Sequence, residues 1–204
     1  MSRKKIFYII FFIVLALGFY FTLILINPDI GKKKFPPISY VRPFEFTNQD
    51  GEKFTNENVK GKVYVAEFFF TTCPGICPDM NRNMRIVYEE FKDEPGFLIL
   101  AHTSDPDTDS VSQLRAFADE MKVNTDRWVF VTGRKDSLYN MARQSYTIDD
   151  PKNNLKSIDD QFLHSQFFSL VDRQGNVLKI YDGLKQSEVR LMIKEIKKLL
   201  KEKG

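Results

Sequence analysis

Two cysteines, Cys73 and Cys77, are the residues of this chain best suited to chemistry, and both lie in the stretch TTCPGICPDM. Two thiols separated by three residues can form a structural disulfide, act as a redox couple, or bind one metal ion. A structural disulfide is disfavoured, because so short a loop gains little from cross-linking. Pro78 suits the first turn of a helix. Since helix N–H groups favour negative charge, we expect the thiolate of Cys77 to form more easily than that of a free cysteine.

The two histidines, His102 and His164, are the candidates for a third metal ligand. His164 lies in FLHSQFFSL, just before a predicted core strand that we expect to lie beside the strand leading to the cysteines. His102 ends another predicted strand, where a hydrogen bond at the rim of the sheet is expected. Thiolates select Cu(I), and an added imidazole accommodates Cu(II). A ligand set of Cys73, Cys77 and His164 would therefore suit copper.

A redox role for the thiols stays open because of Glu67, which stands six residues before Cys73 in an otherwise apolar stretch. If Glu67 is buried, its pKa is raised and it can accept a proton from the thiols near neutral pH. If it faces outward, it needs only one polar neighbour. The Cys-x-x-x-Cys spacing gives a wider loop than Cys-x-x-Cys, and this favours two sulfurs that converge on one ion.

Strand-like and helix-like segments alternate along the body of the chain. Apolar, β-branched and aromatic runs predict strands, and apolar residues at helical spacing predict helices. The predicted order is a strand at 63–70, a helix at 78–91, a strand at 97–103, a helix near 111–121, a strand at 128–131, a short helix near 136–144, a long loop at 147–161, a hairpin around a turn at 174–176 and a last helix from about 187. Asp105 and Asp109 are expected to shape the turn before the second helix and to cap it. This alternation predicts an α/β fold with helices on both faces of a central sheet, whose ligands bind at the carboxyl ends of the strands.

Several motifs together resemble the Sco (SenC) family of membrane-anchored copper proteins that assist cytochrome c oxidase assembly. They are FFFTTCPGICPDM, SDPDTDS, FVTG and LHSQFFSLVDRQGNVLKIYDG, and the similarity extends over about 42–200. The resemblance implies a thioredoxin-like fold with a central mixed sheet, and copper bound by Cys73, Cys77 and His164. It also implies a metallochaperone that delivers copper to the binuclear copper site of the oxidase, or a thiol reductase that prepares the cysteines of that site.

The N-terminal run at 6–26 has neither charge nor proline and is long enough to cross a bilayer as a helix. We expect a cytoplasmic N-terminus at 1–5, an uncleaved transmembrane anchor at 6–26, a tether at 27–41 and a copper-binding domain at 42–204. Basic residues flank both ends of the span, so charge alone leaves its orientation open. Large domains translocate largely regardless of such charges. The domain is therefore expected in the periplasm or at the cell exterior, anchored in the inner (cytoplasmic) membrane.

The sequence favours a copper carrier, which is not an enzyme, over a catalyst. The expected function is a metallochaperone for the copper site of cytochrome c oxidase. The alternative is a membrane-anchored thiol-disulfide oxidoreductase, with Cys73 and Cys77 as the redox-active pair and Glu67 as proton acceptor. The expected partners are the copper-site subunit of the oxidase or its assembly factors, and the membrane. Nucleic acid is not expected, because the net charge of +3 comes from basic tails.

Overall fold

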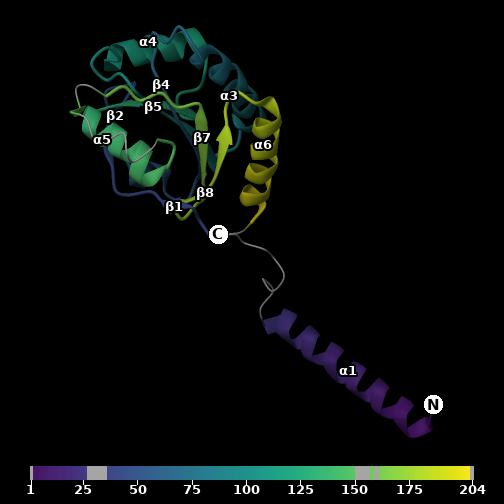
Figure 1. Ribbon diagram of the computed structural model, residues 1–204. Coiled ribbons are helices and arrows are strands. Elements are labelled where there is room, and N and C mark those ends of the chain that lie inside the picture. Colours follow the sequence, from purple (N-terminus) through teal and green to yellow (C-terminus); the bar gives the residue numbers. More distant parts are fainter. Residues whose placement is uncertain (1, 27–35, 150–156, 159–160, 203–204) are drawn as a thin grey trace. The chain divides into compact units, whose positions relative to one another are not determined.

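The strand that leads to the cysteines, β4, lies inside a mixed sheet that has eight strands in the described part of the chain (Figure 1). The structure is a computed structural model that describes residues 2–26, 36–149, 157–158 and 161–202. The strand order is β1-β8-β7-β4-β5-β6-β2-β3. The strands are β1 (Ser39–Tyr40), β2 (Glu45–Asn48), β3 (Lys53–Thr55), β4 (Val63–Phe69), β5 (Phe97–Thr103), β6 (Trp128–Thr132), β7 (Phe167–Val171) and β8 (Asn176–Asp182).

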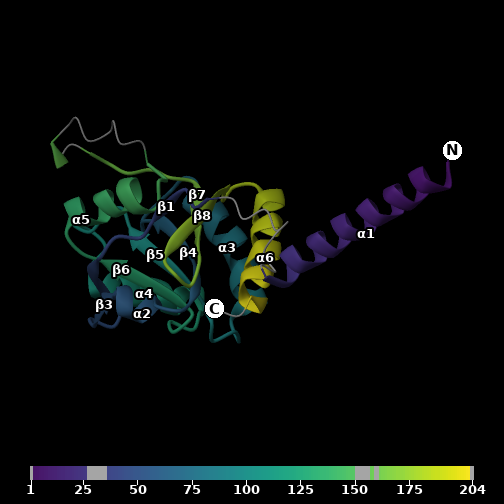
Figure 2. The same cartoon turned by 90° about the horizontal axis from the view of Figure 1, so that it is seen from below.

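The helices of the body cover both faces of this sheet. They are α2 (Asn56–Val59), α3 (Cys77–Phe91), α4 (Val111–Met121), α5 (Lys135–Asn140), the π-helix η1 (Met141–Ser145) and α6 (Gln186–Lys201). Side chains of α3, α4 and α6 share one buried cluster, and those of α2, α5 and η1 share another. Figure 2 shows α3 and α6 together on one side of the sheet and α5 on the other.

The apolar pattern of β4 explains why it is buried on both faces. Successive side chains of a strand point to opposite faces of the sheet. Val63 and Val65 belong to the cluster under α3 and α6, whereas Tyr64 and Ala66 belong to the cluster under α5. β4 pairs in parallel with β5, and β5 pairs in parallel with β6, which confirms the predicted parallel pairs.

The strand after His164 lies beside β4, as the sequence predicted. β7 pairs with β4 in antiparallel fashion, with Tyr64 opposite Val171 and Ala66 opposite Ser169. The start of β7 therefore lies next to the end of β4. This arrangement brings two segments that are about a hundred residues apart in the sequence to one site.

The N-terminal part of the body contains elements that the sequence did not predict, namely β1, β2, β3 and α2. Ser39 and Tyr40 pair with β8, so the end of the stretch expected to be a tether, 27–41, belongs to the sheet. Strands as short as β1, β2 and β3 carry too few residues for a clear alternation of apolar and polar side chains. Residues 27–35 of the expected tether, and most of the long loop expected at 147–161, lie outside the described residues.

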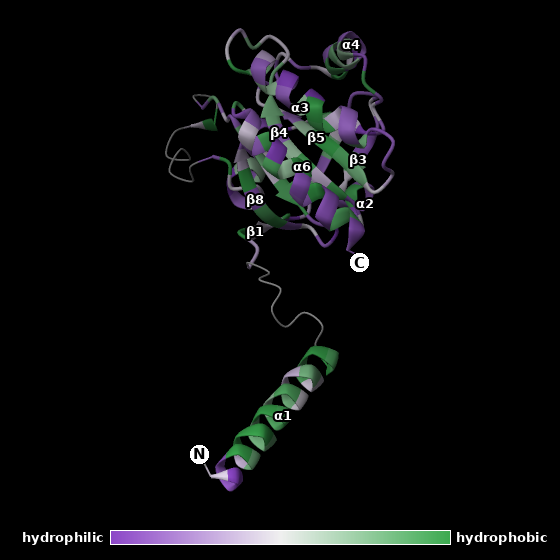
Figure 3. Cartoon of the chain, turned by 90° about the vertical axis from the view of Figure 1, so that its right-hand side faces the viewer, coloured by the Kyte–Doolittle hydropathy of each residue, from purple (hydrophilic) through white to green (hydrophobic). Residues whose placement is uncertain are grey.

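Helix α1 (Arg3–Ile26) belongs to a separate compact unit, Met1–Phe35, while the body forms the unit Pro36–Gly204. None of its 24 residues is buried, and Figure 3 shows hydrophobic residues along almost its whole length. A helix of this length and composition can cross a membrane. Its composition suits a membrane anchor.

Candidate metal centre

Two free thiols lie between the end of β4 and the start of α3. Cys73 is half-buried on the loop, and Cys77 is buried as the first residue of α3. The N–H of Cys73 donates to the carbonyl of Phe70 at 3.2 Å, which closes the start of the loop. Met80 and Met84 follow in α3 and are fully buried in the core. Their packing explains both methionines without a role as ligands.

Burial sets the acidity of Cys77 in the reduced protein. Burial, followed by a smaller contribution from the neighbouring Cys73 side chain, raises the pKa of the Cys77 thiol to about 12. The sequence-based prediction that Cys77 ionises easily is therefore wrong for this form. The cost of placing a charge in an apolar surrounding exceeds the benefit of the helix N-terminus. A metal ion that binds here has to displace the thiol proton.

Asp109, in the turn after β5, fixes the start of the cysteine loop. Its buried carboxylate accepts hydrogen bonds from the Thr71 hydroxyl at 2.5 Å, from the Thr71 N–H at 3.2 Å and from the Thr103 hydroxyl at 2.5 Å. The prediction that Asp109 caps α4 is wrong, because the cap is Ser110, whose hydroxyl accepts from the N–H of Gln113. Asp109 instead joins the turn after β5 to the residue that stands two positions before Cys73.

His164 lies on the segment that enters β7, and its side chain is exposed. Its ring centroid is 4.6 Å from that of Phe162 and 6.0 Å from that of Phe70. Phe70 directly follows β4 and stands three residues before Cys73. The imidazole therefore lies at the edge of the cysteine loop, in contact with an aromatic residue of that loop.

The segment that carries His164 is held by residues that sequence reasoning missed. The N–H of Leu163 donates to the hydroxyl of Tyr139 at 3.1 Å. Further along, the N–H of Gly183 donates to the carbonyl of Gln166 at 2.8 Å, and a Cβ at Gly183 would lie 2.8 Å from the same oxygen. The side chain of Asn83, on α3, donates to the carbonyl of Gly183. No local motif marks these partners, because they are distant from one another in the sequence.

The structure thus brings Cys73 and Cys77 together and places His164 next to their loop. Within the described ranges, no three His, Cys, Asp or Glu side chains lie close enough together to hold a metal ion. The donor types still suit copper, since two thiols and one imidazole lie at the same end of the β4–β7 pair. Binding through all three would require the His164 imidazole and the two sulfurs to come closer together than they are here.

Glu67 is buried in the middle of β4, with a side chain that is 1% exposed. The interpretation of an outward-facing residue is therefore wrong. Neither carboxyl oxygen has a hydrogen-bond partner; the indole N–H of Trp128 interacts with the carboxyl but does not reach hydrogen-bond geometry. Burial raises the pKa of Glu67 to about 8. When it is ionised, Glu67 raises the pKa of Cys77 further, so the two groups interact. Proton transfer between them stays a prediction.

His102 lies on the other face of the sheet from Glu67 and does not approach the cysteine loop. It stacks on Phe68 with a centroid distance of 4.8 Å, and its Nδ1 is 3.3 Å from the carbonyl of Glu67. Burial lowers the pKa of His102 to about 3. The imidazole is fully buried rather than at the rim, and this placement suits a neutral core residue.

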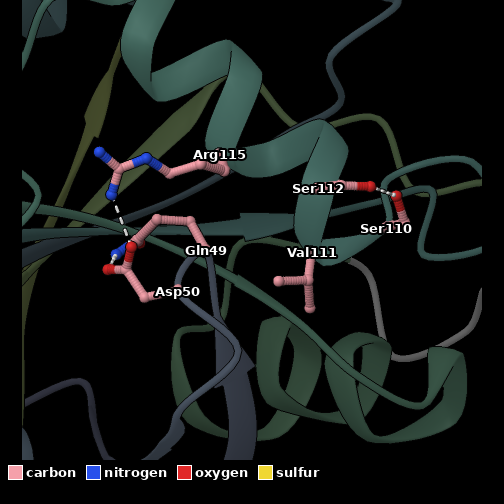
Figure 4. Close-up of a pocket in the computed structure, with 6 residues that line it drawn as sticks. All are labelled: Gln49, Asp50, Ser110, Val111, Ser112 and Arg115. Atoms are coloured by element: carbon pink, nitrogen blue, oxygen red, sulfur yellow. Dashed lines mark hydrogen bonds and ion pairs between the residues drawn. The ribbon is translucent and has the colours of Figure 1, made fainter.

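An open pocket of about 640 Å³ lies elsewhere, between the turn after β2 and the start of α4 (Figure 4). The guanidinium of Arg115 spans it and pairs with the carboxylate of Asp50 at 2.6 Å. Gln49, at its wall, accepts a hydrogen bond from the N–H of Phe130 at 2.9 Å. The pocket contains none of the predicted ligands and is not part of the candidate centre.

The fold and the site define a thioredoxin-like α/β domain with two free thiols between the end of β4 and the start of α3. A protein-family model described as SCO1/SenC matches residues 33–201. The SCO1 protein homolog of Bacillus subtilis is 34% identical over 172 residues, which cover 82% of this chain and 86% of the relative. The chain belongs to the SCO1/SenC family. This finding confirms the resemblance that the cysteine loop and the His164 motif indicated.

Solved structures of the same family confirm the predicted fold class. BsSco, described as a member of the Sco family of cytochrome c oxidase assembly proteins with a disulfide switch, is 33% identical. It aligns with a TM-score of 0.69 over 83% of this chain and 98% of that chain. The copper-bound ScoI of Arabidopsis thaliana is 26% identical and aligns with a TM-score of 0.62 over 78% of this chain and 99% of that chain.

Proposed function

We propose that this protein is a copper metallochaperone that assists assembly of the copper site of cytochrome c oxidase. It carries one copper ion as cargo on Cys73, Cys77 and His164. The observation that carries the proposal is that two free thiols lie at the end of β4 and that the exposed imidazole of His164, before the start of β7, contacts Phe70 at the beginning of the cysteine loop. The copper-bound state of the Arabidopsis relative supports the same cargo.

The residues of the loop suit a carrier that takes up and releases its ion. Two thiolates would hold Cu(I), and His164 would add the nitrogen ligand that Cu(II) favours. Because the pKa of Cys77 is raised by burial, copper uptake releases a proton from this thiol, and the affinity falls as the pH is lowered. Oxidation of the thiols to a disulfide would release the ion, which links copper carriage to the redox state.

We further propose that α1 anchors the protein in the cytoplasmic membrane. In this arrangement the anchor is 6–26, and the copper-binding domain at 42–204 faces the periplasm or the cell exterior. The support is the length and apolar character of α1. The partners would be the copper-site subunit of cytochrome c oxidase or its assembly factors.

A complementation experiment tests the function. The gene is deleted in its host, and the strain receives the wild-type chain, Cys73→Ser, Cys77→Ser or the loop control Thr72→Ser. We expect the wild type and Thr72→Ser to restore the copper content and activity of cytochrome c oxidase, and both cysteine variants to fail. Restoration by either cysteine variant at normal copper supply would contradict the proposal.

A second function, reduction of disulfides in other proteins, is favoured by the environment of Glu67. In this reaction the thiolate of one cysteine attacks a substrate disulfide. The second cysteine then resolves the mixed disulfide, so that the chain is oxidised and the substrate leaves as a dithiol. The pKa of Glu67 is about 8, so the carboxylate that forms above this pH would accept the proton of Cys77. Disulfide reduction should then slow in Glu67→Gln and survive in His164→Ala. Failure of the reduced wild type to reduce any test disulfide would exclude this function.

A further inference from the structure

We propose that Tyr139 is a positioning residue for copper binding. Its hydroxyl holds the main chain next to His164, at the end of the sheet where β4 leads into the cysteine loop. The inference rests on the proposed function, since it assigns a role toward the same ion. It adds a residue from α5, a helix that contributes none of the predicted ligands.

The hydroxyl of Tyr139 connects the segment before β7 to the turn after β5. It accepts the hydrogen bond of the Leu163 N–H at 3.1 Å and donates to the carbonyl of Ser104 at 2.8 Å. The Tyr139 side chain is fully buried, and Leu163 is 3% exposed. In a dry surrounding such a bond is costly to lose, because the Leu163 N–H would remain without a partner. The residue directly before His164 is thus fixed while its imidazole stays exposed.

The same series of hydrogen bonds continues to β4, the strand that leads to the cysteines. The N–H of Ser104 donates to the carbonyl of Phe69 at 2.7 Å, and Phe69 is the last residue of β4. Three hydrogen bonds therefore lead from Leu163 through Tyr139 and Ser104 to a residue four positions before Cys73. Tyr139 sets the distance between the two parts of the proposed ligand set.

Arg143 strengthens this arrangement from the π-helix η1. Its Nε donates to the carboxylate of Asp149 at 2.7 Å, and its Nη2 donates to the side-chain oxygen of Gln161 at 2.6 Å. The guanidinium also lies over the ring of Tyr139, 5.5 Å from its centroid. Arg143 therefore supports the tyrosine ring and the start of the His164 segment together. Single π-helical turns are frequent at functional sites.

Removal of the Tyr139 hydroxyl should weaken Cu(II) binding through His164 more than Cu(I) binding through the thiols. Without the hydroxyl, the segment has to be ordered when the ion binds, and this cost reduces the affinity. We expect about a fivefold loss of Cu(II) affinity, the factor that one buried hydrogen bond is typically worth. Cu(I) affinity should stay within about twofold of the wild type, because two thiolates already satisfy Cu(I).

The experiment compares four reduced full-length chains in detergent: wild type, Tyr139→Phe, Tyr88→Phe and His164→Ala. Tyr88 is the matched control, since its buried hydroxyl accepts from the Asn124 N–H at 2.8 Å on the other face of the sheet. Copper affinities are measured by oxygen-free competition with chelators, and Cu(II) coordination is followed by the nitrogen hyperfine pattern in electron paramagnetic resonance. Hydrogen exchange at the Leu163 amide reports directly on the bond.

The expected result is a weaker Cu(II) affinity, a weaker nitrogen pattern and faster Leu163 exchange in Tyr139→Phe, with Tyr88→Phe unchanged in all three. Equal copper affinities and spectra in the two tyrosine variants would overturn the role of Tyr139, while a loss in His164→Ala would still support the proposed ligand set. A wild type whose Cu(II) spectrum is the same as that of His164→Ala would overturn the ligand set itself, and with it the role of Tyr139.

Discussion

Glu67→Gln should remove one large source of pH dependence from the stability of the body. The ordinary pKa of this carboxyl is 4.5, and burial raises its pKa to about 8 in the folded protein. Between these values the unfolded chain ionises Glu67 and the folded chain does not. The free energy of unfolding therefore falls as the pH rises through this window, by about 1.4 kcal/mol per pH unit from this group. From pH 5 to pH 8 the effect amounts to about 4 kcal/mol.

Urea denaturation of the reduced body, 36–204, at pH 5, 6, 7 and 8 measures this effect. Glutamine keeps the shape of the protonated acid and cannot ionise. We expect wild type and Glu67→Gln to differ little at pH 5, and the variant to be the more stable by several kcal/mol at pH 8. Glu57→Gln, at a side chain that is 77% exposed, serves as control and should follow the wild type. Parallel curves for wild type and Glu67→Gln across the whole range would refute the assignment of a neutral buried acid.

The other predictions concern the cysteine loop and the contacts that hold it. Alkylation of the reduced protein at pH 7, followed by mass spectrometry, should modify Cys73 first and buried Cys77 at least roughly tenfold more slowly; equal rates would contradict the burial of Cys77. Asp109→Asn should lower the free energy of unfolding by about 1–3 kcal/mol, because an amide cannot replace the charged acceptor of three hydrogen bonds, and an unchanged urea midpoint would argue against this anchor. Gly183→Ala should cost about 1–3 kcal/mol, since its Cβ would lie 2.6 Å from the ring of Phe168; a variant as stable as the wild type in thermal unfolding would show that this contact relaxes freely.

The periodic elements could be predicted from the sequence because their pattern is local. The run VYVAEFFF gave β4, and the apolar spacing in the following segment gave α3. The short strands β1, β2 and β3 have two to four residues each. Such strands form because a neighbouring strand offers free hydrogen-bonding groups, and a single stretch of sequence does not carry this information.

The candidate site likewise has residues that the sequence identifies and contacts that it does not. Residue type and spacing single out Cys73, Cys77 and His164, because few other side chains have their chemistry. The contact between Tyr139 and Leu163 joins residues 24 positions apart, so no local pattern announces it. The acidity of Cys77 was predicted with the wrong sign because it depends on how deeply the surrounding chain buries the thiol.

The measurement that tests the account most directly is a competition titration of the reduced full-length chain with Cu(I) without oxygen. A Cu(I) chelator is added to wild type, Cys73→Ser and Thr72→Ser, and the copper that remains on each chain is counted. The account predicts one copper per chain on wild type and Thr72→Ser, and none on Cys73→Ser. If the wild type gives up its copper to the chelator as readily as Cys73→Ser, the thiols do not carry copper and the central claim is contradicted.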